Sequence, residues 1–297
     1  MEYRAHGKLL LSAEYAVLLG ARALALPTSY GQILVEENSG KPGLEWVSYD
    51  HEDQPWFKAV FDAEMNILST SDTSKCLYLQ NLIIKACAAG KAQDLSGIRL
   101  STRLEFPSDW GLGSSSTLVH LVAQWAQADP MELFFETSTG SGYDVACAGT
   151  EKPIIYRLEN GKGQWEPTEL PAVFGQAHFI HLNQKQRSAP EVKRFLHSST
   201  YNSEALTKQI SRITEAFLKA GTEGELADLM QQHEDIISPA LELKPVKELL
   251  FPDFDGAIKS LGAWGGDFIM ALGSQTRKYF QQKGYSTILK LEQLAAS

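Results

Sequence analysis

The sequence predicts an α+β protein made of two domains, because strand and helix patterns are mixed in both halves of the chain. Ile98–Leu104 alternates apolar or threonine side chains with polar ones, as a half-buried strand does. Helical spacing relates four apolar residues of the second half: Leu206, Ile210, Ile213 and Phe217. Gly163–Pro171 contains two prolines and has little periodicity. We therefore predict domains of residues 1–168 and 169–297.

Local patterns predict the other elements. Short apolar runs predict strands at Ile33–Val35, Ile154–Tyr156, Ala177–Leu182 and Phe268–Leu272. Leu77–Ala89 is a strongly apolar helix candidate, and another helical stripe contains Leu226, Leu229, Met230 and Ile237. His233 lies on the same face as that stripe, where a histidine is more often a hydrogen-bonded core residue than a catalyst.

Composition excludes several functional classes. The chain has 297 residues, of which 43% are hydrophobic and 21% charged, as is ordinary for a globular protein. Its formal charge of −9 argues against nucleic acid as the main partner and requires local charge to attract an anionic substrate. We see no secretory signal, no apolar run that could span a bilayer, and no metal-ligand spacing of the cysteines. We therefore expect a cytoplasmic protein without a membrane partner.

The segment Asp109–Leu118 is rich in glycine and serine and leads into a helical pattern that begins near Ser114. Glycines permit close approach of the backbone to a ligand, and a helix N-terminus offers unpaired N–H groups, so the segment predicts a phosphate site. It lacks the Gly-Lys-Ser/Thr ending of a Walker loop, and an ordinary serine-capped helix is the alternative. The residues expected to bind the cofactor are Trp110, Gly111, Leu112, Gly113, Ser114, Ser115 and Ser116.

Further motifs extend this pattern over most of the chain. In order, the informative segments are Gly7–Val17, Gly111–Ser115, Gly140–Ala146 and Gly262–Phe268. Together they resemble the motifs of the GHMP kinases, and most closely those of the mevalonate kinase and phosphomevalonate kinase branch. The resemblance implies a ribosomal protein S5 domain 2-like N-terminal domain, a ferredoxin-like C-terminal domain, and ATP and Mg²⁺ as cofactors.

The resemblance also implies roles for single residues. Asp144 would accept the proton of the substrate or orient its attacking oxygen, and Lys8 would favour the ionised form of Asp144 and contact the transferring phosphate. Glu14 would form an ion pair that organises the first loop, Tyr15 would face the substrate, and Ser115 would be a magnesium ligand. The alternative for Asp144 is that it closes a turn after two glycines.

Other expected contacts are less specific. The residues expected to bind substrate are Glu14, Tyr15, Gly142, Gly265, Gly266, Lys185 and Arg187. Lys185 and Arg187 are equally interpretable as surface charges, and the glycines near residue 265 as a bend before a strand. A carboxylate ligand for magnesium stays unassigned between Glu132, Glu136 and neither.

The chain departs from the family pattern at Asp109, Trp110 and Trp264, where glycine or small residues are usual. Trp110 would stack on the nucleotide base or cap the groove. The two tryptophans together would narrow the site, alter nucleotide choice, or indicate that ATP binding has been lost.

The predicted function is an ATP-dependent small-molecule kinase that transfers the γ-phosphoryl group to an acidic acceptor, namely mevalonate or phosphomevalonate. The alternatives are a diphosphomevalonate decarboxylase-like enzyme and a non-catalytic nucleotide-binding member of the fold. The expected partner is a small anionic substrate rather than nucleic acid, and the chain is expected to be a monomer or a homodimer.

Overall fold

The computed structural model describes most of the chain, namely residues 1–91, 95–183, 192, 195–196, 201–262, 264 and 266–296. It confirms the α+β class, with mostly antiparallel sheets and helices packed on them. Contacts divide the chain into two compact units that interleave in sequence. Unit 1 comprises Met1–Gly7, Tyr30–Ser108 and Leu112–Gly149, and unit 2 comprises Lys8–Ser29, Asp109–Gly111 and Thr150–Ser297. The predicted domains of residues 1–168 and 169–297 stay a prediction.

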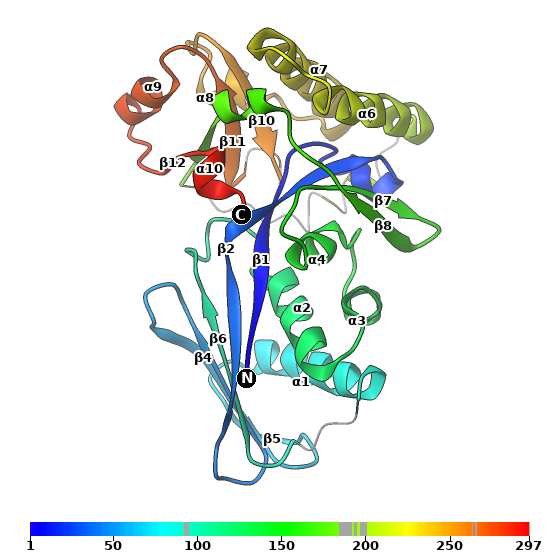
Figure 1. Cartoon of the computed structure of the whole chain (residues 1–297), viewed down its shortest axis with the longest axis vertical. Coiled ribbons are helices and arrows are strands. Elements are labelled where there is room, and N and C mark those ends of the chain that lie inside the picture. The colour runs from blue at the N-terminus through cyan, green and yellow to red at the C-terminus, as the bar shows by residue number, and fades with distance from the viewer. Residues whose placement is uncertain are drawn as a thin grey trace. The chain divides into compact units, whose positions relative to one another are not determined.

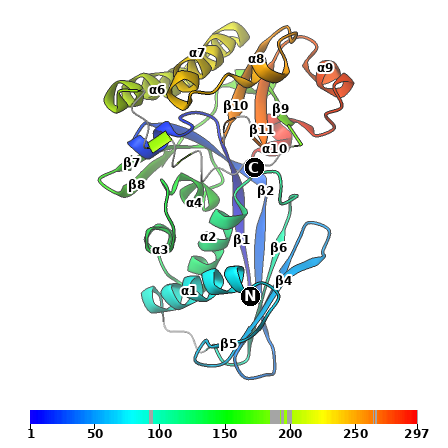
Figure 2. The same cartoon turned by 180° about the vertical axis from the view of Figure 1, so that it is seen from behind.

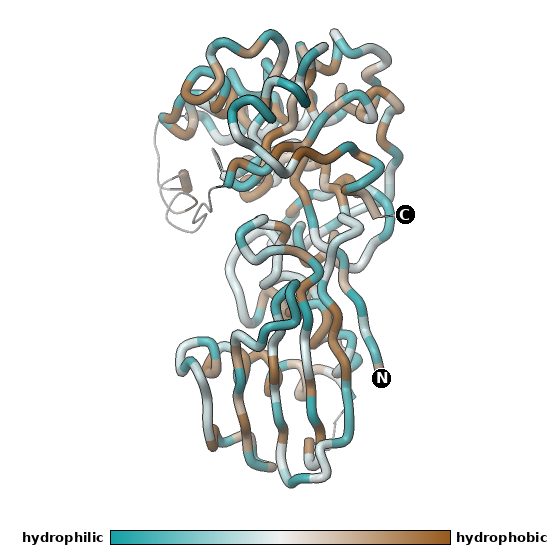
Figure 3. Tube along the Cα trace, turned by 90° about the vertical axis from the view of Figure 1, so that its left-hand side faces the viewer, coloured by the Kyte–Doolittle hydropathy of each residue, from teal (hydrophilic) through white to brown (hydrophobic). Residues whose placement is uncertain are grey.

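The sheet of unit 1 is built from strands of the first third of the chain. These strands are β1 (Glu2–Leu10), β2 (Ala23–Asn38), β3 (Leu44–Tyr49), β4 (Pro55–Phe61), β5 (Ile67–Thr70) and β6 (Ile98–Leu104). Their order is β5-β4-β3-β6-β2, with β1 also paired to β2, and the β3–β6 pair is parallel. Hydrophobic and hydrophilic residues alternate along these strands (Figure 3), so one face of the sheet is apolar.

Four helices cover that face of the sheet (Figures 1 and 2). They are α1 (Thr73–Ala89), α2 (Ser114–Ala126), α3 (Pro130–Thr137) and α4 (Tyr143–Ala148). Helix α1 begins before the predicted Leu77 because Asp72 caps it, accepting a hydrogen bond from Lys75 N at 3.1 Å. Large side chains such as Trp46, Phe61 and Trp125 are fully buried, and each contributes roughly 1.5–3 kcal/mol to folding through burial.

Unit 2 contains a second antiparallel sheet in the order β10-β11-β9-β12. Its strands are β9 (His178–His181), β10 (Ala257–Leu261), β11 (Phe268–Leu272) and β12 (Ile288–Lys290). Also in unit 2, the beginning of β2 pairs with β7 (Ile154–Glu159), and β7 pairs with β8 (Lys162–Pro167). Strand β8 forms where the sequence has little periodicity, because its side chains are mostly exposed and it is held by backbone pairing with β7.

Helices cover the second sheet on both of its faces. The helical segments of unit 2 are η1 (Ala16–Leu19), η2 (Ala172–Gln176), α6 (Ser203–Phe217), α7 (Glu223–Leu241), α8 (Val246–Leu250), α9 (Thr276–Gln282) and α10 (Leu291–Leu294). Ile258 joins an apolar cluster with Phe251 and Phe280. The next residue, Lys259, points to the opposite face of the sheet, as alternation requires, and meets helix α7 there through Glu234. Within the described residues, no helix has the length and apolar character needed to cross a membrane.

Candidate active site

The serine-rich segment opens helix α2 at Ser114, as predicted, and leaves its N-terminus without a side-chain cap. Gly113 precedes the helix with a φ of 90°, a left-handed conformation that glycine adopts without strain. The first backbone bond into the helix runs from Thr117 N to Gly113 O at 3.0 Å, so the amides of residues 114–116 precede it. Ser115 is exposed, whereas Ser116 is buried and donates to Gly113 O at 2.8 Å. This end of α2 can accept an anion.

The residues just before this helix belong to unit 2 and are held there by several contacts. Lys8 Nζ donates to the carbonyl of Gly111 at 2.9 Å. Gly111 has a φ of 64°, and a Cβ atom on it would lie 1.7 Å from Oδ2 of Asp267. His181 Nε2 lies 3.2 Å from the carbonyl oxygen of Asp109. Lys8 and Asp267 therefore both contact the backbone that leads into α2.

Trp110 packs inside unit 2 on residues of the second sheet. Its ring centroid lies 6.1 Å from that of His181 and 5.7 Å from that of Phe268, the latter in an edge-to-face arrangement. The side chain is half-buried, and these contacts fix its ring. Stacking of Trp110 on a nucleotide base stays a prediction.

Asp144 lies in the first turn of the short helix α4 in unit 1. Gly142 precedes that helix with a φ of 80°, and the helix has no side-chain cap. The carboxylate is half-buried and accepts a hydrogen bond from Val145 N at 3.1 Å. Helices α2 and α4 pack against each other (Figure 1), so the helix that begins at Ser114 and the helix of Asp144 are neighbours within one unit.

His120 of α2 contributes to this packing. Burial lowers its pKa to about 4, even though a hydrogen bond with the backbone of Val145 acts in the opposite direction. The imidazole is therefore neutral at pH 7. Gly149 is closely covered by this ring, since a Cβ atom there would lie 2.3 Å from Cε1 of His120. His120 thus fixes the position of α4 on α2.

Glu14 lies in the interior of unit 2, where the ion pair expected for it is formed with Lys259. Its side chain has no exposed surface, and its Oε1 accepts from Lys259 Nζ at 2.5 Å. Nε2 of His233 is 3.0 Å from Oε2 of Glu14. Burial by itself raises the pKa of Glu14, but the charge of Lys259 outweighs it and holds the pKa below its usual value. That Glu14 binds substrate stays a prediction.

The backbone on both sides of Glu14 is strained. Ala13 and Tyr15 have φ values of 69° and 59°. Such conformations cost about 1–3 kcal/mol each in residues other than glycine and persist only where their surroundings enforce them. The phenol oxygen of Tyr15 accepts a hydrogen bond from Trp264 N at 3.1 Å.

Trp264 is buried, with 3% of its surface exposed, and its indole Nε1 donates to Lys244 O at 3.0 Å. Its side chain is therefore a packing element of unit 2. Gly266 is also buried. Three residues expected to bind substrate, Gly265, Lys185 and Arg187, lie outside the described residues.

Three side chains predicted as possible magnesium ligands lie on helices of unit 1. Ser115 is exposed at the start of α2, and Glu132 is exposed in the first turn of α3. Glu136 lies 3.6 Å from Lys85 in an ion pair. Across the part of the chain that the structure describes, no group of three or more His, Cys, Asp or Glu side chains is placed to hold a metal ion. Magnesium retains waters and binds phosphate oxygens, so one or two protein oxygens suffice for it.

Sequence reasoning gave no role to Lys259, Glu234 or Asp267. A lysine within the wholly buried strand β10 is a usable signal, since buried lysines are almost always paired. Glu234 follows His233 in a helix that is otherwise apolar on that face, and its side chain is 1% exposed. Their partners are not readable from the sequence, because Lys259 and Glu14 are 245 residues apart.

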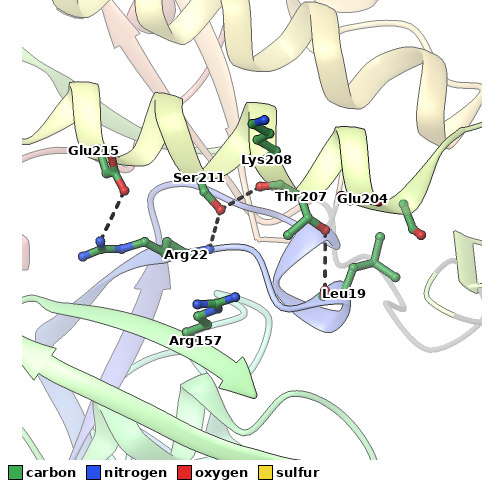
Figure 4. A pocket seen from close by; sticks show the side chains of 9 residues that line it. Leu19, Arg22, Arg157, Glu204, Thr207, Lys208, Ser211 and Glu215 are labelled. Atoms are coloured by element: carbon green, nitrogen blue, oxygen red, sulfur yellow. Dashed lines mark hydrogen bonds and ion pairs between the residues drawn. The ribbon is translucent and has the colours of Figure 1, made fainter. Parts of the chain in front are cut away.

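A pocket of about 630 Å³ lies elsewhere on unit 2, against η1 and α6 (Figure 4). Ser211 accepts from Arg22 N at 3.0 Å, and the guanidinium of Arg22 lies 3.2 Å from Glu215. Thr207 donates to Leu19 O at 3.5 Å. Half of the eight polar residues that line it are thus bonded within the pocket wall, and none of the predicted site residues lines it.

Comparison with known proteins shows the fold. No family model matches the sequence, and no curated protein matches it either. Solved structures do. Mevalonate kinase of Methanococcus jannaschii superimposes with a TM-score of 0.70 at 14% identity, over 100% of this chain and 98% of that one. Phosphomevalonate kinase of Streptococcus pneumoniae, in complex with phosphomevalonate and AMPPNP, gives 0.72 at 16% identity over 98% and 99%.

Galactokinase of Lactococcus lactis, complexed with galactose, gives a TM-score of 0.73 at 14% identity over 99% of this chain and 92% of that one. These three proteins act on different acceptors but share one architecture. The chain therefore has the fold of the GHMP kinases, as the resemblance of its motifs predicts.

Proposed function

We propose that the chain is a phosphotransferase that moves the γ-phosphoryl group of ATP to a small acidic acceptor. The observation that carries this proposal is the uncapped N-terminus of α2, which packs beside the short helix that bears Asp144. The fold shared with small-molecule kinases supports it. An uncapped helix N-terminus that begins with glycine and serine can bind phosphate through its free backbone amides. A carboxylate on a neighbouring helix can orient the acceptor or take its proton.

Each residue has a defined task in this reaction. The amides of residues 114–116 bind phosphate oxygens of the nucleotide, and Lys8, held at the carbonyl of Gly111, adds a positive charge beside the same loop. When the acceptor is a hydroxyl, its oxygen forms the new P–O bond, the bond between the γ-phosphorus and the β–γ bridging oxygen breaks, and ADP leaves. Asp144 takes the proton of that hydroxyl.

The donor set also fits the metal. Magnesium, when bound with the nucleotide, neutralises charge on the phosphate oxygens. The exposed hydroxyl of Ser115 is the protein oxygen that we propose as its ligand. Ser115 also lies at the helix end where the phosphates would bind. Its hydroxyl, as the metal ligand, and the backbone amides of residues 114–116 would therefore act on the same phosphate groups.

Mevalonate and phosphomevalonate are the acceptors that we favour. Gly140–Ala146 and Gly262–Asp267 resemble the mevalonate and phosphomevalonate kinase branch, and kinases for both acceptors share the fold. A phosphate acceptor requires no strong base, so Asp144 would then orient the attacking oxygen rather than take a proton. Because a galactokinase has the same fold, galactose should be tested as an alternative acceptor in any activity assay.

The test is an ATP-consumption assay with mevalonate, phosphomevalonate, galactose and homoserine as acceptors. The proposal expects turnover with mevalonate or phosphomevalonate that is lost in Asp144→Asn. Asp228→Asn is the matched control, because Asp228 is an exposed aspartate of α7. Turnover only with galactose or homoserine would keep the kinase and change the acceptor class.

Two outcomes would overturn the kinase assignment. Release of carbon dioxide from diphosphomevalonate would identify a decarboxylase-like enzyme. Binding of AMPPNP without turnover of any acceptor would identify a non-catalytic nucleotide-binding protein.

A further inference from the structure

The turn Ala13–Tyr15 is held by a cluster of buried ionisable groups, which we call the Glu14 cluster: Glu14, His233, Glu234 and Lys259. All four side chains are within 1% of complete burial, and all lie in unit 2. The phosphotransfer roles proposed above use none of these four residues. The cluster therefore requires a separate explanation.

Each member of the cluster has a defined contact with the strained turn or with β10. Ala13 N donates to Nε2 of His233 at 3.0 Å, which fixes the first strained residue. Lys259 Nζ donates to Glu14 at 2.5 Å and to the carbonyl of Ser260 at 2.8 Å. Glu234 accepts from Ser260 N at 3.1 Å, and its other oxygen lies 3.2 Å from the Ser260 hydroxyl. The cluster thus ties the turn to the end of β10.

The hydrogen bonds define the charge of the cluster. Because Nε2 of His233 accepts from Ala13, the imidazole is neutral, in agreement with a pKa that burial and Lys259 lower to about 4. Burial raises the pKa of Glu234 to about 8, so Glu234 is protonated at neutral pH. One anion, Glu14, and one cation, Lys259, then remain, and they neutralise each other.

This arrangement is not the most stable way to fill the interior. Nδ1 of His233 and Oε2 of Glu14 have no hydrogen-bond partner among the described residues. Buried ion pairs and unpartnered polar atoms are commonly less stabilising than apolar side chains of the same volume. The cluster does, however, enforce one backbone conformation at a turn that would otherwise relax.

The turn connects two predicted site segments. Strand β1 carries Lys8, at the carbonyl of Gly111, and ends just before the turn. Beyond it, the Tyr15 phenol accepts from the backbone of Trp264. Trp264 lies in the segment that follows β10, the strand of Lys259. The cluster and the Tyr15–Trp264 contact are therefore linked through the turn and β10.

We propose that His233, Glu234 and Lys259 are positioning residues that hold Glu14 and the Ala13–Tyr15 turn in the one conformation in which the buried Tyr15 accepts the hydrogen bond from Trp264 N and the preceding strand places Lys8 at Gly111. This inference rests on the proposed function for its catalytic consequence. The geometric part, that the cluster holds the turn, is independent of any activity.

The first experiment compares His233→Leu with His233→Gln, since the amide oxygen of glutamine can replace Nε2 as the acceptor for Ala13 N. In His233→Leu, amide hydrogen exchange at Ala13 is expected to rise by roughly a hundredfold through local opening, while exchange in β6 of unit 1 is unchanged. His233→Gln is expected to restore protection to within about tenfold of wild type. Equal protection at Ala13 in His233→Leu and wild type would overturn the proposal, whether or not the protein is a kinase.

The second experiment measures kinetics of the same variants. We expect His233→Leu to lower kcat or raise the acceptor KM by roughly tenfold or more, with the Kd of AMPPNP within about twofold of wild type. His233→Gln should recover most of that loss, and His51→Leu, at an exposed position of unit 1, should have no effect. Equal loss of AMPPNP binding and turnover would indicate general damage and overturn the positioning role. Absence of turnover in wild type would count against the proposed function alone.

The double variant Glu14→Gln/Lys259→Met tests the same proposal if His233→Leu does not fold. It removes both charges together, so no ion is left unpaired in the interior. The proposal expects a folded protein with increased amide exchange over Ala13–Tyr15 and a roughly tenfold lower kcat. A folded double variant with wild-type exchange and wild-type kcat would overturn it.

Discussion

Asp144 and Glu14 are carboxylates in similarly apolar sequence segments, but the two units place them in opposite environments. Asp144 in unit 1 is half-buried at the start of a helix and bonds to the next backbone amide. Glu14 in unit 2 has no exposed surface and is paired with Lys259. The carboxylate of Asp144 is therefore partly accessible, whereas the charge of Glu14 is committed to contacts inside unit 2. The following substitutions test this contrast.

The largest effect is expected for Lys259→Met, which leaves Glu14 buried without its cation. Breaking a buried ion pair by removing one partner costs about 3–5 kcal/mol of unfolding free energy. Denaturant unfolding measures this loss, with Asp144→Asn as the comparison, for which less than about 1 kcal/mol is expected. Equal losses in the two variants would remove the contrast between the units.

The next effect concerns Asp144 and is kinetic. If Asp144 takes the proton of a hydroxyl acceptor, Asp144→Asn should lower kcat by roughly a hundredfold or more, about 2.7 kcal/mol of transition-state stabilisation. With phosphomevalonate the loss should be smaller, because a phosphate oxygen requires no base. Steady-state kinetics with both acceptors decides the point, and an unchanged kcat with each acceptor would exclude Asp144 from the reaction.

A smaller effect is expected for Lys8, which lies at the loop rather than in the interior. Lys8→Met should lower turnover by at least roughly tenfold, about 1.4 kcal/mol, through loss of a charge beside the phosphates. Lys208→Met is the matched control, because Lys208 is an exposed lysine of α6 in the same unit. Initial rates at saturating ATP provide the measurement. A wild-type rate in Lys8→Met would leave Lys8 a structural bond to Gly111 only.

A further effect, which varies with pH and is not ranked with the others, is the stability of Glu234→Gln relative to wild type. Because the folded protein raises the pKa of Glu234 to about 8, the protonated carboxyl stabilises the fold fully below the ordinary value of 4.5, and this contribution is lost as pH rises toward 8. His233 acts oppositely between about 4 and 6.5, since its folded pKa is lowered. Glutamine cannot ionise, so the variant should gain stability relative to wild type as pH rises.

Thermal unfolding of Glu234→Gln and wild type at pH 5, 7 and 9 measures that difference. A difference in Tm that is constant with pH would mean that Glu234 is already ionised in the folded protein at the lowest pH.

Elements with a strong local pattern were predictable from the sequence. Strand β11 matches the predicted Phe268–Leu272, and α2 starts at Ser114, because each depends on neighbours in sequence. Strand β8 was missed, because it has no apolar alternation and exists through pairing with β7. The segments of the candidate site were recognisable by their glycines and serines. Only one member of the Glu14–Lys259 pair could be predicted. Glu14 lies in a recognisable motif, but nothing in the sequence identifies Lys259, 245 residues away, as its partner.

The carboxylate of Asp267 occupies the space beside the α-carbon of Gly111. A library that varies residue 111 alone is therefore expected to favour glycine, since any side chain there requires Asp267 to move and adopts a φ of 64°. Varying positions 111 and 267 jointly opens combinations that neither single scan can reach.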